Sequence, residues 1–154
     1  MQIILWRHAD AEDPGPAGDS ARNLTKKGRR QAERMADWLR PRMEGDWKVL
    51  ASPANRAVQT AQALGVEFET RPGLAPERDA RLLLREAGWP EGGNVLVVGH
   101  NPTLGEAAAL LLGDGEREVA FRKAAIWWFA TRKRDVRTET VLKCVMEPDL
   151  LEAP

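Results

Sequence analysis

The sequence predicts an α/β fold, a three-layer α/β/α sandwich with a mostly parallel central sheet. Three short, nearly continuous apolar runs, of the kind found in buried parallel strands, occupy residues 2–6, 48–51 and 95–98. Segments in which apolar residues recur at helical spacing separate these runs along the chain. Because strands that alternate with helices build a parallel sheet, we expect one sheet covered by helices on both faces.

Two helices are expected in the first half of the chain. The first begins after Thr25, whose hydroxyl can cap a helix start, and runs to about Met43 with its apolar residues on one face. The second begins with Ser52 as the N-cap and Pro53 as the first helical residue. It stops near Gly65, since glycine is the usual residue after a helix end.

Two further helices are expected in the second half. The third has Pro76 near its start and runs to about Ala87. The fourth opens with Asn101 and Pro102 and ends at Gly113. Asn101 is interpreted mainly as the N-cap of this helix.

The remaining segments are loops and edge strands. Residues 10–23 are rich in Gly, Pro, Asp and Ser, which indicates a loop. A brief strand is expected at residues 66–69, and two more at 125–131 and 140–146, arranged as a hairpin or at a sheet edge. The basic stretch at 132–137 is interpreted as a solvated turn.

Length and charge exclude several classes of protein. The 154 residues suffice for one compact domain, which we expect to span residues 1–154. Lys plus Arg equals Asp plus Glu at 23 each, whereas nucleic-acid binders usually have a large positive excess. The apolar runs are too short to cross a bilayer, and the opening residues lack the features of a signal peptide. We therefore expect a cytoplasmic protein without nucleic-acid or membrane partners.

The supply of metal ligands is small. The chain contains two histidines, His8 and His100, and one cysteine, Cys144. A zinc site built from nitrogen and sulfur ligands would be under-equipped, and no acidic cluster suggests a magnesium site. We expect no metal and no other cofactor.

Charged and polar residues follow directly where three of the predicted strands end. Arg7 and His8 follow the first strand, Arg56 lies in the opening turn of the helix after the second, and His100 follows the strand at 95–98. Ligands of open α/β sheets bind at the carboxyl ends of the strands. The sequence therefore predicts that these four side chains meet at one edge of the sheet.

Such a group of side chains suits phosphoryl transfer. Two guanidinium groups offer forked donors that match phosphate oxygens, and nearby helix N-termini add free N–H groups. An imidazole with one nitrogen fixed by a backbone partner can attack phosphorus with the other. A second imidazole can hold the phosphoryl oxygens in the transition state.

Four segments resemble motifs of the histidine phosphatase superfamily, which includes the phosphoglycerate mutases. RHADAE at 7–12, SPANRAVQTA at 52–61 and VGHNP at 98–102 resemble its three motifs, and DSARNLTKKGRRQA at 19–32 is similar to its small SixA-type phosphohistidine phosphatases. The resemblance implies that His8 is phosphorylated and that Arg7, Arg56 and His100 bind the phosphoryl group. Apart from the resemblance, Asn101 is a candidate for a further phosphate contact beside its expected role as an N-cap. The short length implies that the helical cap of larger branches is missing.

Three residues in or near these motifs merit separate expectations. Ala9 replaces the glycine common in the superfamily, which is frequent in the SixA-like branch. Trp6 is bulkier than the usual residue before the first motif and bears on how the first strand packs. Gly28 is interpreted as a residue that lets two backbones approach closely.

A general acid is the one part of the site for which two interpretations stand side by side. Many superfamily members protonate the leaving oxygen with a carboxylic acid, for which Glu77 is the first candidate and Asp79 the second. The alternative is that both acids simply favour a helix start. A leaving imidazole, with a pKa of about 6.5, departs far more easily than an alkoxide, so a site without a secure acid suits phosphohistidine.

Three functions remain open from the sequence. The leading hypothesis is a cofactor-independent phosphatase that acts, through a phosphohistidine intermediate on His8, on the phosphohistidine of a signalling or phosphotransfer protein. The second is a small-molecule phosphomonoesterase of the same superfamily. The third is a non-catalytic module that binds phosphoproteins.

Overall fold

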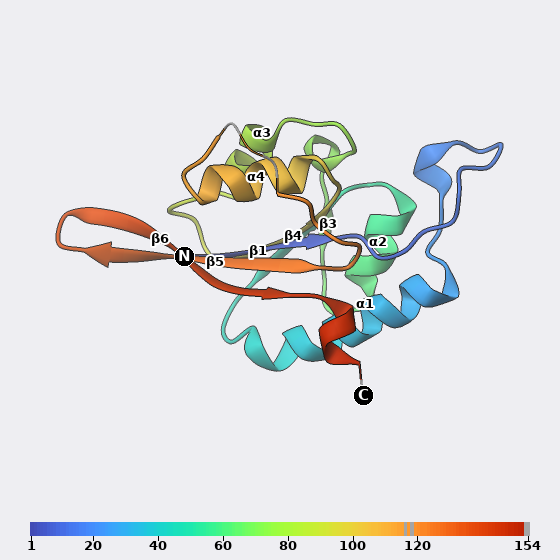
Figure 1. Ribbon diagram of the computed structural model, residues 1–154, viewed down its shortest axis with the longest axis horizontal. Helices are drawn as coiled ribbons and strands as arrows, with labels where there is room; N and C mark the ends of the chain where they lie inside the picture. Colours follow the sequence, from blue (N-terminus) through green and yellow to red (C-terminus); the bar gives the residue numbers. More distant parts are fainter. Residues whose placement is uncertain (116, 118, 153–154) are drawn as a thin grey trace.

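A six-stranded sheet forms the centre of the computed structural model, which describes residues 1–115, 117 and 119–152 (Figure 1). Its strands run in the order β3-β2-β4-β1-β5-β6. They are β1 (Gln2–Arg7), β2 (Lys48–Ala51), β3 (Glu69–Thr70), β4 (Val95–Gly99), β5 (Ile126–Arg134) and β6 (Arg137–Met146). Strands β1, β2, β3 and β4 are parallel to one another, while β5 pairs antiparallel with β1 and β6 pairs antiparallel with β5. The predicted mostly parallel sheet with an antiparallel hairpin at one edge is confirmed.

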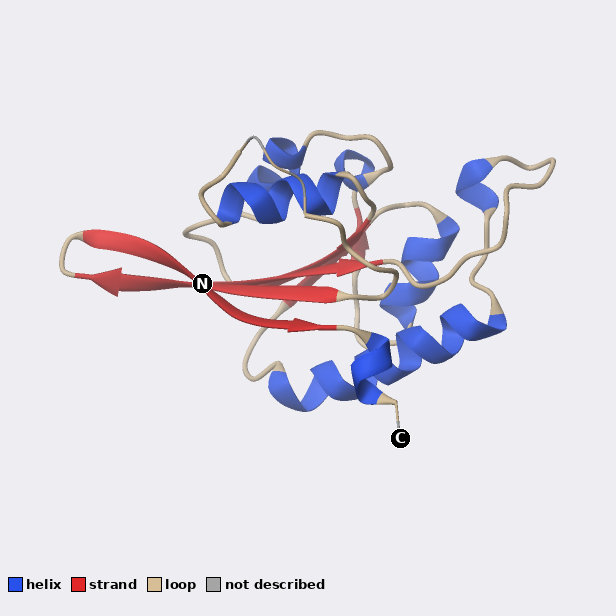
Figure 2. Ribbon diagram, in the orientation of Figure 1, coloured by secondary structure: helices blue, strands red, loops and turns tan. Residues whose placement is uncertain are grey.

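Helices cover both faces of this sheet, as Figure 2 shows. They are α1 (Lys26–Leu39), α2 (Asn55–Gln62), α3 (Ala80–Glu86) and α4 (Thr103–Leu111). One buried cluster joins α1 and α2 to one face, and a second joins α3 and α4 to the other. These four helices all pack onto the sheet, so none of them forms a cap, and none is long and apolar enough to cross a membrane. The predicted three-layer sandwich is confirmed.

Strand β1 shows why a continuous apolar run is needed at the centre of such a sandwich. Ile4 and Trp6 belong to the cluster under α1 and α2, while Ile3 and Leu5 belong to the opposite cluster. All four are fully buried because successive side chains of a strand point to opposite faces, and both faces are covered. The indole of Trp6 donates to the carbonyl of Ala124 at 2.9 Å, which accommodates the bulky residue before the first motif.

The adjacent tryptophans of β5 are packing residues on the two faces of the sheet. Trp127 stacks against Phe121 with ring centroids 5.6 Å apart. Trp128 meets the edges of Trp38 and Trp47 at 6.5 and 5.7 Å. The alternation of a strand therefore explains this pair, for which the sequence offered no role.

The first helix begins as predicted and ends earlier. Thr25 is its N-cap, and its hydroxyl oxygen accepts a hydrogen bond from the backbone N–H of Gly28 at 3.0 Å. The α-helix ends at Leu39 instead of near Met43, and a 3₁₀ turn, Arg40–Arg42, follows. Pro41 lies in that turn, and a proline there cannot donate the next helical hydrogen bond.

Three other predicted helix starts are wrong by a few residues. Helix α2 has Ala54 as its N-cap instead of Ser52. Helix α3 is capped by the Asp79 carboxylate, which accepts from Arg81 N–H at 2.9 Å, so the helix starts well after Pro76. Helix α4 follows Pro102, and the side chain of Asn101 does not cap it.

The edge strands also differ from the predicted limits. The strand expected at 66–69 is reduced to Glu69–Thr70, and Val66 is exposed. The basic stretch at 132–137 is mostly strand, with only residues 135 and 136 in the turn. Cross-strand pairs such as Arg132 with Glu139, at 2.6 Å, support this extension of the hairpin.

Candidate active site

The carboxyl edge of the sheet brings the four predicted side chains together. Arg7 ends β1, His8 and His100 follow β1 and β4 directly, and Arg56 is the second residue of α2, which follows β2. The strands β2, β4 and β1 are neighbours in the sheet, so their carboxyl ends are adjacent. The two imidazole rings lie with their centroids 5.2 Å apart. The predicted gathering of these residues is confirmed, while their roles stay predictions.

Backbone hydrogen bonds fix the segment that contains His8. Its N–H donates to the carbonyl of Gly99 at 3.1 Å, and its carbonyl accepts from the N–H of Ala124 at 3.1 Å. The next residue, Ala9, donates its N–H to the hydroxyl of Thr60 at 3.1 Å, and that hydroxyl donates to the carbonyl of Arg56 at 2.7 Å. Thr60 thus ties helix α2, and with it Arg56, to the histidine.

The orientation of the His8 ring leaves one nitrogen available. Its Nδ1 atom lies 2.8 Å from the carbonyl oxygen of Ala9. A carbonyl can only accept, so Nδ1 holds the ring hydrogen and Nε2 has a free lone pair. The residue is only 6 % exposed, so little of the ring faces bulk solvent. This is the arrangement that a nucleophilic imidazole requires.

Burial and charge keep both imidazoles neutral. The pKa of His8 is lowered to about 4, mainly by burial and in part by the guanidinium groups of Arg56 and Arg7. Burial also lowers the pKa of His100 to about 3, with further contributions from His8 and Arg56. At neutral pH, His8 therefore has its lone pair free without any base to remove a proton.

The tautomer of His100 follows from its partner, Ser52. The Nε2 atom lies 2.7 Å from Ser52 Oγ, and that oxygen also accepts from the N–H of Ala54 at 3.2 Å. Ser52 is fully buried, and among the described residues its hydroxyl hydrogen has no acceptor other than His100 Nε2. Because a buried hydroxyl needs an acceptor, Ser52 donates and the ring hydrogen of His100 lies on Nδ1. That Nδ1 is buried without a protein partner and can donate to a phosphoryl oxygen.

The two arginines are held by their outer nitrogens. Arg7 Nη1 donates to the carbonyl of Phe121 at 2.7 Å. Arg56 donates from Nη1 to the carbonyl and from Nη2 to the carboxylate of Asp19, both at 3.0 Å. The Nε atom of each arginine is buried without a protein partner.

These unpartnered atoms define the chemistry of the site. Among the described residues, three buried donors without a protein acceptor, Arg7 Nε, Arg56 Nε and His100 Nδ1, belong to the four predicted side chains. Unsatisfied buried donors are costly, so an anion that accepts from all three would be bound strongly. The site is therefore suited to a tetrahedral oxyanion placed before His8 Nε2.

Asn101 lies beside this group but is already engaged. Its amide nitrogen donates to the carbonyl of Phe121 at 2.9 Å, the same carbonyl that holds Arg7. Its Oδ1 is buried without a protein partner. The N-cap interpretation is wrong because the amide turns to this carbonyl, and its contact with phosphate stays a prediction.

Neither candidate acid is buried with these four side chains, and a catalytic role for either stays a prediction. Glu77 is exposed and has a positive φ of 65°, outside helix α3. Asp79 caps that helix, which is the structural alternative considered for both acids. Sequence reasoning missed two residues of the site, Ser52 and Asp19. Both lie within the recognised motifs, which was the only available signal.

We expect the two histidines to be neutral across the physiological range. The chain contains only two, so NMR of imidazole carbon-bound protons should give two titrations with midpoints near pH 4 and 3 instead of the usual 6.5. The unfolded chain binds more protons between pH 6.5 and 4, so stability should fall as the pH drops through that window. Nitrogen-15 shifts should show hydrogen on Nδ1 of both rings. A midpoint near 6.5 for either ring would contradict this assignment.

Comparison with known proteins places the chain among phosphatases. The sequence model of the histidine phosphatase superfamily (branch 1) matches residues 3–83. The phosphohistidine phosphatase SixA of Escherichia coli K12 is 36 % identical over 135 residues, 82 % of this chain and 83 % of that protein. The chain belongs to the histidine phosphatase superfamily. A SixA homologue of Haemophilus influenzae is 32 % identical over 142 residues, 82 % of this chain and 85 % of that protein.

A solved structure from the same superfamily has the same fold. The protein histidine phosphatase SixA in complex with tungstate superimposes with a TM-score of 0.81 at 30 % identity, over 99 % of this chain and 100 % of that one.

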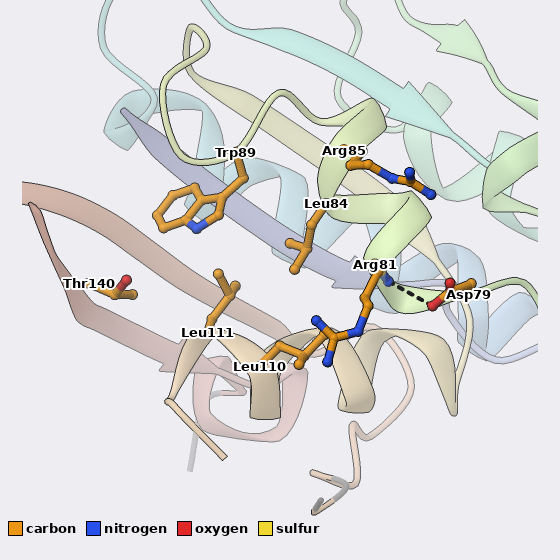
Figure 3. Close-up of a pocket in the computed structure, with 8 residues that line it drawn as sticks. All are labelled: Asp79, Arg81, Leu84, Arg85, Trp89, Leu110, Leu111 and Thr140. Atoms are coloured by element: carbon orange, nitrogen blue, oxygen red, sulfur yellow. Dashed lines mark hydrogen bonds between the residues drawn. The ribbon is translucent and has the colours of Figure 1, made fainter. Parts of the chain in front are cut away.

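A separate pocket of about 560 Å³ lies at α3 and α4 (Figure 3). Leu84, Trp89 and Leu111 form much of its wall, and the guanidinium of Arg81 lies at its side. Neither histidine lines it. It therefore does not belong to the histidine phosphatase site.

Proposed function

We propose that this protein is a cofactor-independent phosphatase that hydrolyses phosphohistidine in a signalling or phosphotransfer protein. The observation that supports it most is the His8 ring, whose Nδ1 lies 2.8 Å from a backbone carbonyl and whose Nε2 is free. The side chains beside it, Arg7, Arg56 and His100, each have a buried donor without a partner among the described residues, and these donors are available to a phosphoryl group that meets that nitrogen.

The proposed reaction has two displacements at phosphorus. In the first, His8 Nε2 attacks, the N–P bond of the substrate breaks, and the departing imidazole takes the electron pair and a proton from solvent. In the second, water attacks the phosphoryl group on His8, the new N–P bond breaks, and phosphate leaves with the oxygen of water. Arg7, Arg56 and His100 donate to the phosphoryl oxygens in both steps, when charge spreads over them.

The environment of the site favours phosphohistidine over alkyl phosphates. Glu77 is exposed, and no hydrogen bond or ion pair to another described residue holds its carboxylate in place, whereas imidazole, with a pKa of about 6.5, departs without a positioned acid. A surface hollow of about 350 Å³, lined in part by Arg7, Lys27 and Lys123, opens beside the site. This leaves room for the surface of a protein substrate. The cytoplasmic location expected from the sequence stays a prediction.

The substrate class can be tested with matched substrates and one acid variant. We expect a phosphohistidine-containing phosphotransfer protein to be hydrolysed with a kcat/KM at least about a hundredfold above that of sugar phosphates. Glu77→Gln should leave that rate unchanged. Faster turnover of sugar phosphates that Glu77→Gln abolishes would instead support the phosphomonoesterase. Binding of phosphoprotein without any turnover would support the non-catalytic module.

A further inference from the structure

The Arg56 guanidinium is held by a residue that lies outside the central sheet and its four α-helices. Asp19 lies in the 10–23 loop, at the start of a 3₁₀ turn, Asp19–Ala21. It accepts from both outer nitrogens of Arg56, through its carbonyl at Nη1 and its Oδ2 at Nη2, each at 3.0 Å. Arg56 is 4 % exposed, while the Asp19 side chain is 53 % exposed. A surface loop therefore reaches in to a buried cation.

Asp19 is itself held from the other side. Arg22 Nη1 contacts Asp19 Oδ1 at 3.1 Å, and Arg22 Nε donates to the carbonyl of Glu12 at 2.6 Å. The hydrogen bond from Arg22 is the main cause that lowers the pKa of Asp19, with Arg56 adding to it. Asp19 is therefore an anion at neutral pH, and each of its carboxylate oxygens has a different arginine.

Two interpretations of this contact predict opposite effects. A carboxylate on a guanidinium can compete with phosphate for the same donors, so that the loop would have to leave before substrate binds. Alternatively, it can hold the guanidinium in place for phosphate. The geometry favours the second, since Asp19 takes only the outer nitrogens and leaves Arg56 Nε buried and free.

The other arginine of the site has the same arrangement. Arg7 is also held at an outer nitrogen, by the carbonyl of Phe121, and its Nε is also buried and free. Two arginines from different elements, anchored at Nη and free at Nε, thus flank the histidines. We propose that Asp19, braced by Arg22, is a positioning residue that aims Arg56 Nε at the phosphoryl group. This inference rests on the proposed phosphoryl site, but not on the identity of the substrate.

Positioning of this kind acts on affinity for the phosphoryl group. A guanidinium without an anchor must be ordered when the anion binds, and that loss of freedom weakens binding. An anchored guanidinium is already in place and does not reorganise as charge develops. The Asp19 carboxylate also affects the pKa of His100. Its negative charge raises that pKa and so opposes the lowering that burial causes.

The test is the binding of orthovanadate to the folded protein, measured without turnover by calorimetry. We expect Asp19→Ala to raise the dissociation constant of vanadate about tenfold and to lower kcat/KM on any hydrolysed substrate by a similar factor. Asp19→Asn should lie between this variant and the wild type, because its amide oxygen can still accept from Arg56. Arg22→Ala should shift the constant in the same direction by a smaller factor.

The control lies in the same loop. Asp13 is exposed, and no hydrogen bond or ion pair joins it to another described residue, so Asp13→Ala should bind vanadate like the wild type. The His100 titration in Asp19→Ala should also move to lower pH, a shift that a change in loop packing alone would not produce.

Tighter binding of vanadate by Asp19→Ala would overturn the proposal and identify the carboxylate as a competitor for Arg56. Unchanged binding would overturn it as well. If Asp19→Ala fails to fold, as judged by circular dichroism, Asp19→Asn and Arg22→Ala decide in the same way. If Asp19→Ala binds vanadate more weakly but the wild type does not hydrolyse phosphohistidine, this inference is supported while the proposed substrate is contradicted.

Discussion

Replacing His8 with alanine is expected to abolish turnover, lowering kcat by a factor on the order of 10⁴ or more. The structure leaves His8 Nε2 as the free imidazole nitrogen of that ring, and the variant has no group at this place that could accept the phosphoryl group. The measurement is the steady-state hydrolysis of phosphohistidine protein, together with trapping of phosphoenzyme in alkali, where phosphohistidine persists. Wild type should show the intermediate, and His8→Ala should not.

His100→Gln is the matched variant, because it removes the other imidazole and keeps the nucleophile. We expect it to slow turnover while it still forms phosphoenzyme, since Nδ1 of His100 is a donor to the phosphoryl group in this site. If His8→Ala still formed phosphoenzyme, or if only His100→Gln lost it, His100 would be the nucleophile and His8 the donor.

Replacing Gly28 with alanine is expected to destabilise the fold by about 3 kcal/mol. A Cβ atom at this position would lie 1.9 Å from the carbonyl oxygen of Asp10, so one backbone segment must move. The clash outweighs the helix propensity of alanine, which favours the substitution by only about 1 kcal/mol. The same carbonyl accepts from the N–H of Thr25 at 3.1 Å, so the movement also disturbs the helix start.

Urea denaturation measures this loss, with Gly93→Ala as the control. An added Cβ at Gly93 would have nothing within 4 Å. The free energy of unfolding of Gly93→Ala should therefore differ from that of the wild type by less than about 0.5 kcal/mol. Equal stability of the two variants would mean that the Asp10 loop yields easily, and the interpretation of Gly28 as a residue of close approach would be wrong.

The parts of the fold that sequence predicted well are those in which local pattern and burial agree. The runs at 2–6, 48–51 and 95–98 are apolar on both faces because both faces are covered, so their pattern needs no knowledge of partners. The two-residue β3 fails this condition, since both of its residues are exposed and little in their pattern marks a strand.

Two predicted helix starts were wrong because the polar side chain that was expected to cap the helix bonds to a distant residue instead. Ser52 before Pro53 has the local pattern of an N-cap, yet its hydroxyl donates a hydrogen bond to His100, which is 48 positions away. Asn101 similarly turns to the carbonyl of Phe121. Local propensity cannot reveal such contacts, because the competing hydrogen bond exists only after the strands have paired.

The site was predictable to the extent that strand ends determine it. Arg7, His8 and His100 stand at or directly after strand ends, and their meeting follows from the order of the parallel strands. Asp19 contacts Arg56 from a loop, and the topology of the sheet does not predict the position of a loop residue. Only its place in the motif at 19–32 gave a signal, and that signal did not specify a contact.

The position of β1 in the sheet has a consequence for biosynthesis. Strand β1 is translated before the other five strands, yet its two neighbours are β4 and β5, which end at Gly99 and Arg134. Until those segments emerge, the nascent chain holds an apolar strand with both edges unpaired, a state that favours aggregation. The two histidines can meet only after residue 100 has been translated, so the nascent chain cannot assemble the proposed site before that point.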